Sequence, residues 1–408
     1  MTMGDIDLAA ARAAEQLAFQ LETADSGGLT RNPRTLEGGK VRYVGPEDWT
    51  SGFFPGSLWL AYELMGDPAL HEAARRHTEA IRAAARVTWH HDVGFMVQCS
   101  FGNGYRLGES AYREALREAA ASLATRWRPQ VRLIQSWDTD REWMATRGWE
   151  CPVIIDNMMN LELLLKAAVL AGEPRYAEMA RSHADRTLEN HYRPDGSCFH
   201  VVDYSLVDGR VRSRETGQGQ SDASAWARGQ AWGVYGFAMM RRLTGERRYL
   251  ERSLASLDFI EAHPRYPEDG VPYWDFDDPR IATQPESVPR DASAAALLAS
   301  ALYELSADPG LPASSSARLL GWGDRVMASL SGSAYRAESG TNGGFILMHS
   351  TGALPMGREI DVPLNYADYY YLEGLLRRKR ILAGLPPVED DPDPGAGLRL
   401  GVDSGRRD

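Results

Sequence analysis

The chain of 408 residues contains 43% hydrophobic and 25% charged residues, close to the averages of soluble globular proteins. This composition excludes a wholly disordered chain, and no run of about 18 apolar residues predicts a membrane-spanning helix. The 45 basic and 56 acidic residues give a net charge of −11. An acidic chain without a basic segment is poorly suited to bind nucleic acid or an anionic membrane, so we expect neither partner.

The first residues and the cysteines bear on the cellular location. Residues 1–7 are acidic and lack the basic and then apolar pattern of a secretory signal peptide. Cys99, Cys151 and Cys198 are an odd number without paired spacing, which argues against a disulfide framework and against a zinc site. We therefore expect a cytoplasmic protein.

Amphipathic helical segments occur in pairs along the chain. In each pair, a run with apolar residues at helical spacing ends at a turn, usually at a glycine, and a second such run follows. The pairs lie at 56–85, 160–190 and 230–262, and another begins at 292–306. Five or six hairpins would use most of the chain, either as an open solenoid or as a closed (α/α)6 barrel. Strand signals are weak and are found at 201–205 and 343–349.

The segments between the hairpins are rich in Trp, Asp, His, Gln and Gly. They include 45–56, 89–105, 134–138, 151–160, 193–204, 216–232, 267–277 and 343–350. A solenoid that only displays a surface would have short polar turns, whereas in a closed ring these segments gather at one end as an aromatic, polar cleft suited to a sugar. We therefore predict one all-α domain over residues 1–384, an (α/α)6 barrel with a cleft at one end. Residues 385–408, rich in Pro, Gly and charge, are expected to be a mobile tail.

Two aspartates in these segments are candidates for acid–base chemistry. Asp156 follows the apolar run 153–155 at the start of a helix. It is either a helix N-cap or a partly desolvated carboxyl group with a raised pKa, and both can hold together. Asp92 follows His90 and His91, and is either a turn residue or a functional carboxylate. A metal site is not favoured, because adjacent histidines rarely point the same way and no further ligand cluster is found.

Arg228 and Trp232 lie four residues apart and share one face of a predicted helix, whereas Trp226 is expected to point elsewhere. The pair is either a core tryptophan with an arginine packed on it, or an arginine offered to a carboxylate beside an indole that stacks on a sugar. His200, taken alone, is best interpreted as a core histidine. The sequence contains no credible phosphate-binding loop and no Gly-x-Ser-x-Gly elbow.

Taken together, several segments resemble the unsaturated glucuronyl hydrolases of glycoside hydrolase family 88. The similar region runs from Trp49 to Arg377. The segments that carry it are DWTSGFFPGSLWLAYE, HHDVGF, IIDNMMNLELL, PDGSCFHVVDY, TGQGQSDASAWARGQAWGVYGF, PEDGVPYWDF, PRDASAAA and NYADYYYLEGLLR. The resemblance implies an (α/α)6 barrel that acts on oligosaccharides left by polysaccharide lyases. Such enzymes hydrate the C4=C5 double bond of a terminal 4,5-unsaturated uronic acid and release it as a keto acid. Neither a metal nor an organic cofactor is implied.

The resemblance also implies roles for individual residues. Asp156 matches the general acid and base of the family, and Asp92 matches a second carboxylate that holds substrate hydroxyls and favours a protonated Asp156 through like-charge repulsion. The residues implied to lie around the terminal sugar are His200, Gln218, Arg228 and Trp232. The residues implied to contact substrate at the cleft wall are Trp49, Phe53 and Trp137.

One region departs from the family pattern. Relatives that act on sulfated glycosaminoglycan fragments can carry a Ser-x-x-Ser-x-Lys run, whereas the corresponding segment here, 349–355, keeps one serine and lacks the lysine. Arg358 is a candidate substitute, and the aglycone stays open. Hydrolysis of unsaturated rhamnogalacturonan fragments, a sugar epimerase on the same barrel and a non-catalytic helical scaffold are alternative functions. We expect a monomer or a homodimer.

Overall fold

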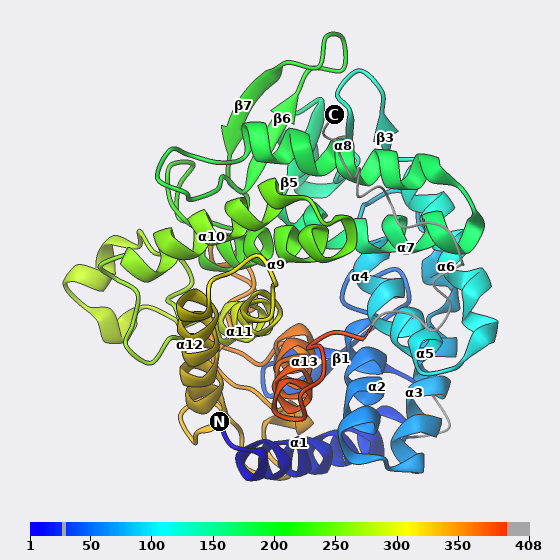
Figure 1. Cartoon of the computed structure of the whole chain (residues 1–408), viewed down its shortest axis with the longest axis vertical. Helices are drawn as coiled ribbons and strands as arrows, with labels where there is room; N and C mark the ends of the chain where they lie inside the picture. The colour runs from blue at the N-terminus through cyan, green and yellow to red at the C-terminus, as the bar shows by residue number, and fades with distance from the viewer. Residues whose placement is uncertain (27–29, 390–408) are drawn as a thin grey trace, which may run out of the picture.

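The computed structural model describes residues 1–26 and 30–389, and in these residues paired helices form a closed ring (Figure 1). The inner helices are α2 (Phe53–Met65), α4 (Val93–Val97), α5 (Asn103–Arg106), α7 (Leu161–Ala171), α9 (Ala227–Thr244), α11 (Ala292–Ser306) and α13 (Asn365–Leu382). A π-helical turn, Gln98–Gly102, joins α4 to α5. The outer helices are α1 (Met3–Ala24), α3 (Pro68–Ala80), α6 (Arg113–Ala124), α8 (Pro174–Asn190), α10 (Arg247–Ala262) and α12 (Ala313–Ser331). The predicted (α/α)6 barrel is confirmed, and the open solenoid is excluded.

The two rings differ in their sequences as their positions require. The inner helix α11, ASAAALLASALYELS, is buried along almost its whole length, and its many alanines let neighbouring helices approach closely. The outer helix α8 buries only one face, at positions three and four residues apart. A helix that is hydrophobic on all sides therefore joins the inner ring, and a helix that is hydrophobic on one side joins the outer ring.

The ring is closed by the two ends of the chain. Helix α13 packs between α11 and α2, and its outer partner α1 comes from the first residues of the chain. The turns within the hairpins follow the predicted glycines: Gly66, Gly172 and Gly245 end α2, α7 and α9 with φ values of 71°, 66° and 74°. Residues with a Cβ rarely adopt this left-handed conformation.

Short antiparallel strands decorate the barrel. Strands β1 (Asn32–Glu37) and β2 (Lys40–Val44) form one hairpin, and β3 (Trp127–Arg128) pairs with β4 (Leu133–Ile134). A three-stranded sheet has the order β5 (Cys151–Ile154), β6 (Val201–Tyr204), β7 (Val211–Glu215). The strand signal at 201–205 is confirmed as β6. The signal at 343–349 is wrong, because this segment contains a 3-10 turn and a single bridge from Arg336 to Leu347.

All inner helices run in the same direction, so their N-terminal ends share one end of the barrel. Trp49 lies just before α2, Asp92 before α4, Trp226 before α9 and Asp291 before α11, and the turn that carries Asp156 leads into α7. The predicted gathering of the loop segments at one end is therefore confirmed. The C-terminal ends meet at the opposite end, which we call the closed end.

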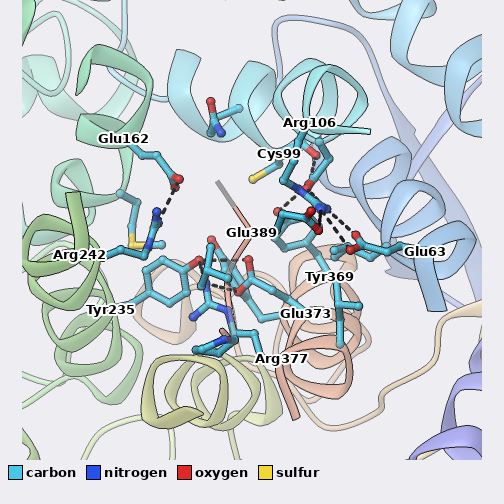
Figure 2. Close-up of a pocket in the computed structure, with 18 of the residues that line it drawn as sticks. Glu63, Cys99, Arg106, Glu162, Tyr235, Arg242, Tyr369, Glu373, Arg377 and Glu389 are labelled. Atoms are coloured by element: carbon cyan, nitrogen blue, oxygen red, sulfur yellow. Dashed lines mark hydrogen bonds and ion pairs between the residues drawn. The ribbon is translucent and has the colours of Figure 1, made fainter. Parts of the chain in front are cut away.

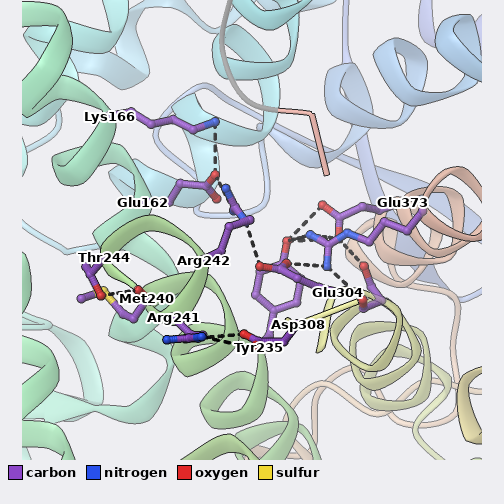
Figure 3. A network of polar contacts seen from close by, with 12 residues as sticks. Glu162, Lys166, Tyr235, Met240, Arg241, Arg242, Thr244, Glu304, Asp308 and Glu373 are labelled. Atoms are coloured by element: carbon purple, nitrogen blue, oxygen red, sulfur yellow. Dashed lines mark hydrogen bonds and ion pairs between the residues drawn. The ribbon is translucent and has the colours of Figure 1, made fainter. Parts of the chain in front are cut away.

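Charged side chains fill the closed end around a cavity of about 80 Å³ (Figure 2). A continuous series of ion pairs links α7, α9, α11 and α13 (Figure 3). Its members are Lys166, Glu162, Arg242, Glu304, Arg377 and Glu373. A second pair, Arg106 with Glu63 at 2.5 Å, joins α5 to α2. Cations at these C-terminal ends complement the negative ends of the helix dipoles.

Only the beginning of the expected tail can be described. Leu385 donates its N–H to the Arg380 carbonyl, and Arg380 contacts the carboxylate of Glu389 at 2.7 Å at the mouth of the closed-end cavity (Figure 2). Residues 390–408, the rest of that tail, lie outside the described residues. Within the described residues, no helix is long and apolar enough to cross a membrane.

Candidate active site

A cleft with a volume of about 730 Å³ opens at the end of the barrel where the inner helices begin. This size suits a disaccharide. Side chains from many separate segments line it: Arg34, Arg42, Glu47, Asp48, Trp49, Trp89, His90, Asp92, Trp137, Arg141, Trp143, Met144, Gln218, Ala353, Met356, Arg358, Glu359 and Tyr366. The lining therefore combines indole faces, hydrogen-bonding groups and charges of both signs, as expected for a site that binds a charged sugar.

Asp156 lies on a 3-10 turn, Ile155–Asn160, between β5 and α7. Its side chain makes no cap hydrogen bond, so the N-cap interpretation is wrong: the turn inserts before the helix, which begins only at Leu161. The side chain keeps 12% of its exposure. Burial raises the pKa of Asp156 to about 7, Arg228 opposes this rise, and the negative charge of Asp92 adds to it. Asp156 can therefore hold a proton near neutral pH.

Asp92 stands at the start of α4 and has a histidine at each of its carboxylate oxygens. His90 Nδ1 lies 3.1 Å from Oδ2, and His91 Nε2 lies 3.2 Å from Oδ1. The adjacent histidines thus reach the same side chain, which their neighbouring positions did not indicate. Burial alone would raise the pKa of Asp92, but the two rings outweigh it and hold the pKa below its usual value. The two aspartates therefore differ in protonation, one anionic and one able to be neutral.

His200 is a buried histidine, as expected for it alone, but it also faces the acid. Its Nδ1 accepts the backbone N–H of Gly217 at 3.0 Å and that of Gln218 at 3.2 Å. Burial, with Arg228 next in size, lowers the pKa of His200 to about 3, so the ring is neutral at pH 7. With Nδ1 used as an acceptor, the single proton sits on Nε2, which is 3.9 Å from Oδ1 of Asp156. The ring thus presents a hydrogen-bond donor beside the acid.

Arg228 is almost fully buried and held by four groups. It pairs with Asp291 at 2.6 Å and donates to the carbonyl oxygens of Thr351 and Gly352, each at 2.6 Å. Its guanidinium lies 4.6 Å from the ring of Trp226. The expectation that Trp226 points elsewhere is wrong, because Trp226 precedes α9 as its N-cap and helical spacing does not apply to it. Arg228 is therefore packed on a tryptophan and also carries its charge near Asp156.

The aromatic residues expected at the site fall into two groups. Trp49 and Trp137 line the cleft. Phe53 and Trp232 are fully buried and do not line it, so the structure corrects their expected places. Phe53 packs beneath Trp49 with ring centroids 5.9 Å apart, and Trp232 packs against Phe95 at 5.1 Å. Phe53 begins α2 and Trp232 lies on the second turn of α9, so both are near the cleft end of an inner helix and support the residues that pack on them.

Several residues of the cleft are not predicted from the sequence. Tyr366, at the start of α13, packs on Trp49 at 5.0 Å and lies 5.4 Å from the Arg228 guanidinium. Trp143 packs against Trp137 at 5.3 Å. Tyr366 lies within one of the segments that carry the family resemblance, and this resemblance is the feature of the sequence that could have indicated it. Trp143 has no local signal, because it reaches the cleft from a short 3-10 turn, Glu142–Thr146, that lies outside the helical hairpins.

The arrangement favours an anionic ligand despite the negative charge of the whole chain. The N-terminal ends of the inner helices bring partial positive charge to the cleft. Arg228 is buried, does not line the cleft and is paired with Asp291, but its charge still acts on Asp156 and lowers the pKa of that group. Gln218 lines the cleft and is fixed by donating its Nε2 to the Gly352 carbonyl at 3.0 Å. In the described part of the chain, no group of three or more His, Cys, Asp or Glu side chains is placed to hold a metal ion.

Comparisons with known proteins place the chain in a family. The model of Glycosyl Hydrolase Family 88 matches residues 35–278. An unsaturated glucuronyl hydrolase of Formosa agariphila is 42% identical over 344 residues, which are 84% of this chain and 82% of that protein. An unsaturated chondroitin disaccharide hydrolase of Streptococcus pneumoniae is 31% identical over 335 residues, 81% of each chain.

Solved structures agree with this placement. The crystal structure of an unsaturated glucuronyl hydrolase specific for heparin matches with a TM-score of 0.87 and 41% identity, over 95% of this chain and 100% of that one. The unsaturated glucuronyl hydrolase of Bacillus sp. GL1 matches with a TM-score of 0.82 and 32% identity, over 92% and 97%. The chain belongs to glycoside hydrolase family 88 and is a glycoside hydrolase.

Proposed function

We propose that this enzyme releases the terminal 4,5-unsaturated uronic acid from oligosaccharides of the glycosaminoglycan type that polysaccharide lyases produce. The observation that carries the proposal is the unequal pair of carboxyl groups: Asp156 with its pKa raised to about 7, and the anionic Asp92 beside it. The names of the relatives, which act on unsaturated uronate-containing sugars, support the same substrate class.

The chemistry follows from the protonation state of Asp156. The neutral carboxyl group gives its proton to C4 of the vinyl ether, and positive charge develops at C5 and on the ring oxygen. The anionic Asp92 stabilises that charge. The resulting Asp156 carboxylate takes a proton from the water that attacks C5, which restores the acid. The hemiketal formed at C5 opens, and the aglycone leaves from C1 with the keto acid as the second product.

The remaining side chains bind and orient the sugar. Arg228 and the helix N-termini provide positive potential for the uronate carboxylate. His200 presents its Nε2–H near Asp156, and Gln218 offers its amide oxygen. Trp49 and Trp137 are the flat surfaces on which sugar rings stack. Phe53 and Trp232 act through the groups that pack on them.

We further propose a single catalytic domain over residues 1–384 that works as a monomer or a homodimer in the cytoplasm, without a cofactor. The pairing of α1 with α13 supports the single domain, because neither half of the ring buries its helices alone. Cys99, Cys151 and Cys198 are buried free thiols, which is typical of a reducing compartment.

The test uses the ultraviolet absorbance of unsaturated disaccharides, which disappears when the conjugated double bond is consumed. We expect the enzyme to remove this absorbance, and Asp156→Asn to lower kcat by more than about 100-fold with the fold retained, because an amide cannot give its proton to carbon. Asp195→Asn, which neutralises an exposed carboxylate outside the cleft, is the matched control. An Asp156→Asn variant within about tenfold of wild type would show that another group is the acid. If the enzyme turns over only unsaturated rhamnogalacturonan fragments, the proposed glycosaminoglycan type of substrate is wrong.

A further inference from the structure

Arg34 is the extra residue of a bulge in strand β1. The residues before and after it, Pro33 and Thr35, pair with neighbouring residues of β2, so Arg34 itself has no partner on that strand. A bulge turns the side chain of its extra residue in a direction that the regular pleat would not give. The side chain of Arg34 lies in the lining of the cleft and keeps 14% of its exposure.

Arg34 holds two carboxylates that come from opposite ends of the chain. Its Nε donates to Oε1 of Glu359 at 2.6 Å, and its Nη1 donates to Oδ2 of Asp48 at 2.8 Å. Asp48 lies just before α2, Glu359 lies in the loop 350–362 before α13, and both line the cleft. Arg34 therefore ties strand β1 to two separate segments of the cleft wall.

The contact with Asp48 fixes the backbone that carries Trp49. The second oxygen of Asp48, Oδ1, accepts the backbone N–H of Thr50 at 2.9 Å and the hydroxyl of the same residue at 2.6 Å. The carboxylate thus spans Trp49, whose indole ring lies 5.9 Å from the guanidinium of Arg34. Arg34 therefore holds in place a turn that presents an indole to the cleft.

The contact with Glu359 fixes the loop 350–362. The backbone carbonyl of Glu359 accepts the N–H of Gly352 at 2.7 Å, and a Cβ on Gly352 would lie only 2.8 Å from the Cβ of Glu359. The glycine therefore leaves room for the two halves of the loop to pack. The carbonyl oxygen of Gly352 in turn accepts from Gln218 at 3.0 Å and from Arg228 at 2.6 Å. The same loop is thus held both at Glu359 and at Gly352.

We propose that Arg34 is a positioning residue: by holding Asp48 and Glu359 together, it keeps these two segments of the cleft wall in the arrangement that binds the substrate. Arg34 does not bind the substrate itself, because one cation shared by two carboxylates presents no positive charge to an anion. The inference rests on the proposed function for its kinetic consequence only.

The first test is Arg34→Gln, with an unsulfated unsaturated disaccharide as the substrate. We expect KM to rise about fivefold, because the wall that contacts the sugar loosens, and kcat to stay within about twofold of wild type. Asp92 and the turn that carries Asp156 have contacts of their own, so the chemical step is retained. An unchanged KM, or a fall in kcat as large as the fall in kcat/KM, would overturn the inference.

Glu359→Gln separates positioning from direct binding, since it leaves the arginine in place. If Arg34 acts through Glu359, this variant also raises KM, by about two- to fivefold, and the double variant raises KM no further than Arg34→Gln alone. If Arg34 bound an anionic group of the substrate directly, the loss of a competing carboxylate would instead lower KM. A lower KM in Glu359→Gln is therefore evidence against the positioning role.

The second measurement is hydrogen exchange of the backbone, which needs no turnover. Mass spectrometry follows peptides that cover 46–52 and 350–362, which contain the N–H groups of Thr50 and Gly352. We expect faster exchange in both peptides of Arg34→Gln, and in the second peptide of Glu359→Gln, because the contacts that hold these segments are weakened. Exchange at the wild-type rate in either peptide of Arg34→Gln would contradict the inference. Failure of the proposed substrate would remove only the kinetic readout, so the two failures stay distinguishable.

The control is Arg247→Gln, which breaks an ion pair with Glu251 on the exposed surface outside the cleft. It is expected to leave KM and the exchange of both peptides unchanged. If Arg34→Gln does not fold, Glu359→Gln gives both readouts by itself. An unchanged KM and unchanged exchange over 350–362 in that variant would then overturn the inference.

Discussion

The pKa of Asp156 connects chemistry with stability at the scale of a single residue. The pKa of this carboxyl group is about 7 in the folded chain against an ordinary value of 3.8, so the folded state binds more protons than the unfolded state between these values. Stability therefore decreases as pH rises from about 4 to about 7, and the cost remains above that window. Asp156 is therefore ready to donate a proton at neutral pH, and its ionisation at that pH lowers the stability of the folded chain.

Asp156→Asn is expected to remove that cost. The variant should be more stable than wild type by about 2–4 kcal/mol at pH 8, and equally stable at pH 4, where the wild-type group is also neutral. Urea unfolding at both pH values measures the difference, with the exposed Asp195→Asn as the control. A difference that is the same at both pH values would contradict the raised pKa.

The local sequence predicts part of this residue-scale picture. Ile154 and Ile155 indicate a desolvated carboxyl group, and that part is confirmed. The contribution of Asp92 comes from a position 64 residues earlier, and no local pattern contains it. The same limit explains Trp232, since helical spacing shows that it shares a face with Arg228 but not how deeply that face is buried.

Among the elements around the cleft, the loop 350–362 is held from both sides. His349, just before the loop, and Glu359 and Asp361, within it, have φ values of 61°, 51° and 53°. Residues with a Cβ rarely adopt such positive values. Arg228 binds two carbonyl oxygens of the loop, and Arg34 pairs with Glu359 at 2.6 Å. These contacts maintain the unusual backbone and fix the tip of the loop in the cleft wall.

Arg358 is the exposed charge that this loop adds to the cleft. Within the described residues, Arg34, Arg42 and Arg141 of the lining have carboxylate partners, whereas Arg358 has none. We therefore expect Arg358→Gln to raise KM for sulfated unsaturated disaccharides about fivefold and to leave KM for unsulfated ones unchanged, as a single exposed charged contact allows. A panel of both disaccharides measures this, with Arg210→Gln on the exposed surface as control. An equal change for both kinds would exclude sulfate recognition by Arg358.

Elements differ in how far local sequence predicts them. Long helices with apolar periodicity and a terminal glycine were predicted correctly, because both signals lie within the element. Strand β5 was missed, since its four residues form a strand only by pairing with β6, about fifty residues later. The 3-10 turn before α7 is not predicted for a related reason: its side chains bond to backbone groups that are distant along the chain, Asn157 to Ile134 and Asn160 to Phe95.

At the scale of the whole molecule, the two ends of the barrel use charge in opposite ways. Around the cleft, partial positive charge from the helix N-termini is left available to a ligand. At the closed end, cations and carboxylates from successive inner helices neutralise one another (Figure 3). The sequence shows these charges near the ends of its helices, and helical spacing gives the pairs within α7 and α13. It does not show the pairs between helices, because those join residues that are distant along the chain.

Arg377 tests how strongly the closed end holds the ring together. It contacts Glu304 at 2.9 Å and Glu373 at 3.4 Å, and donates to the Tyr235 hydroxyl at 2.7 Å. Its loss leaves the carboxylate of Glu373 without its cation and Glu304 with Arg242 alone. Arg377→Met, which keeps most of the volume, is expected to lower the free energy of unfolding by about 3–5 kcal/mol in urea. It should leave kcat and KM of the folded enzyme unchanged, because the cleft lies at the other end. Arg247→Met, which breaks an exposed pair with Glu251, is the control and should cost less than about 1 kcal/mol. Equal stability of the two variants would mean that apolar packing alone closes the ring, and a fall in kcat for Arg377→Met would mean that the two ends are coupled.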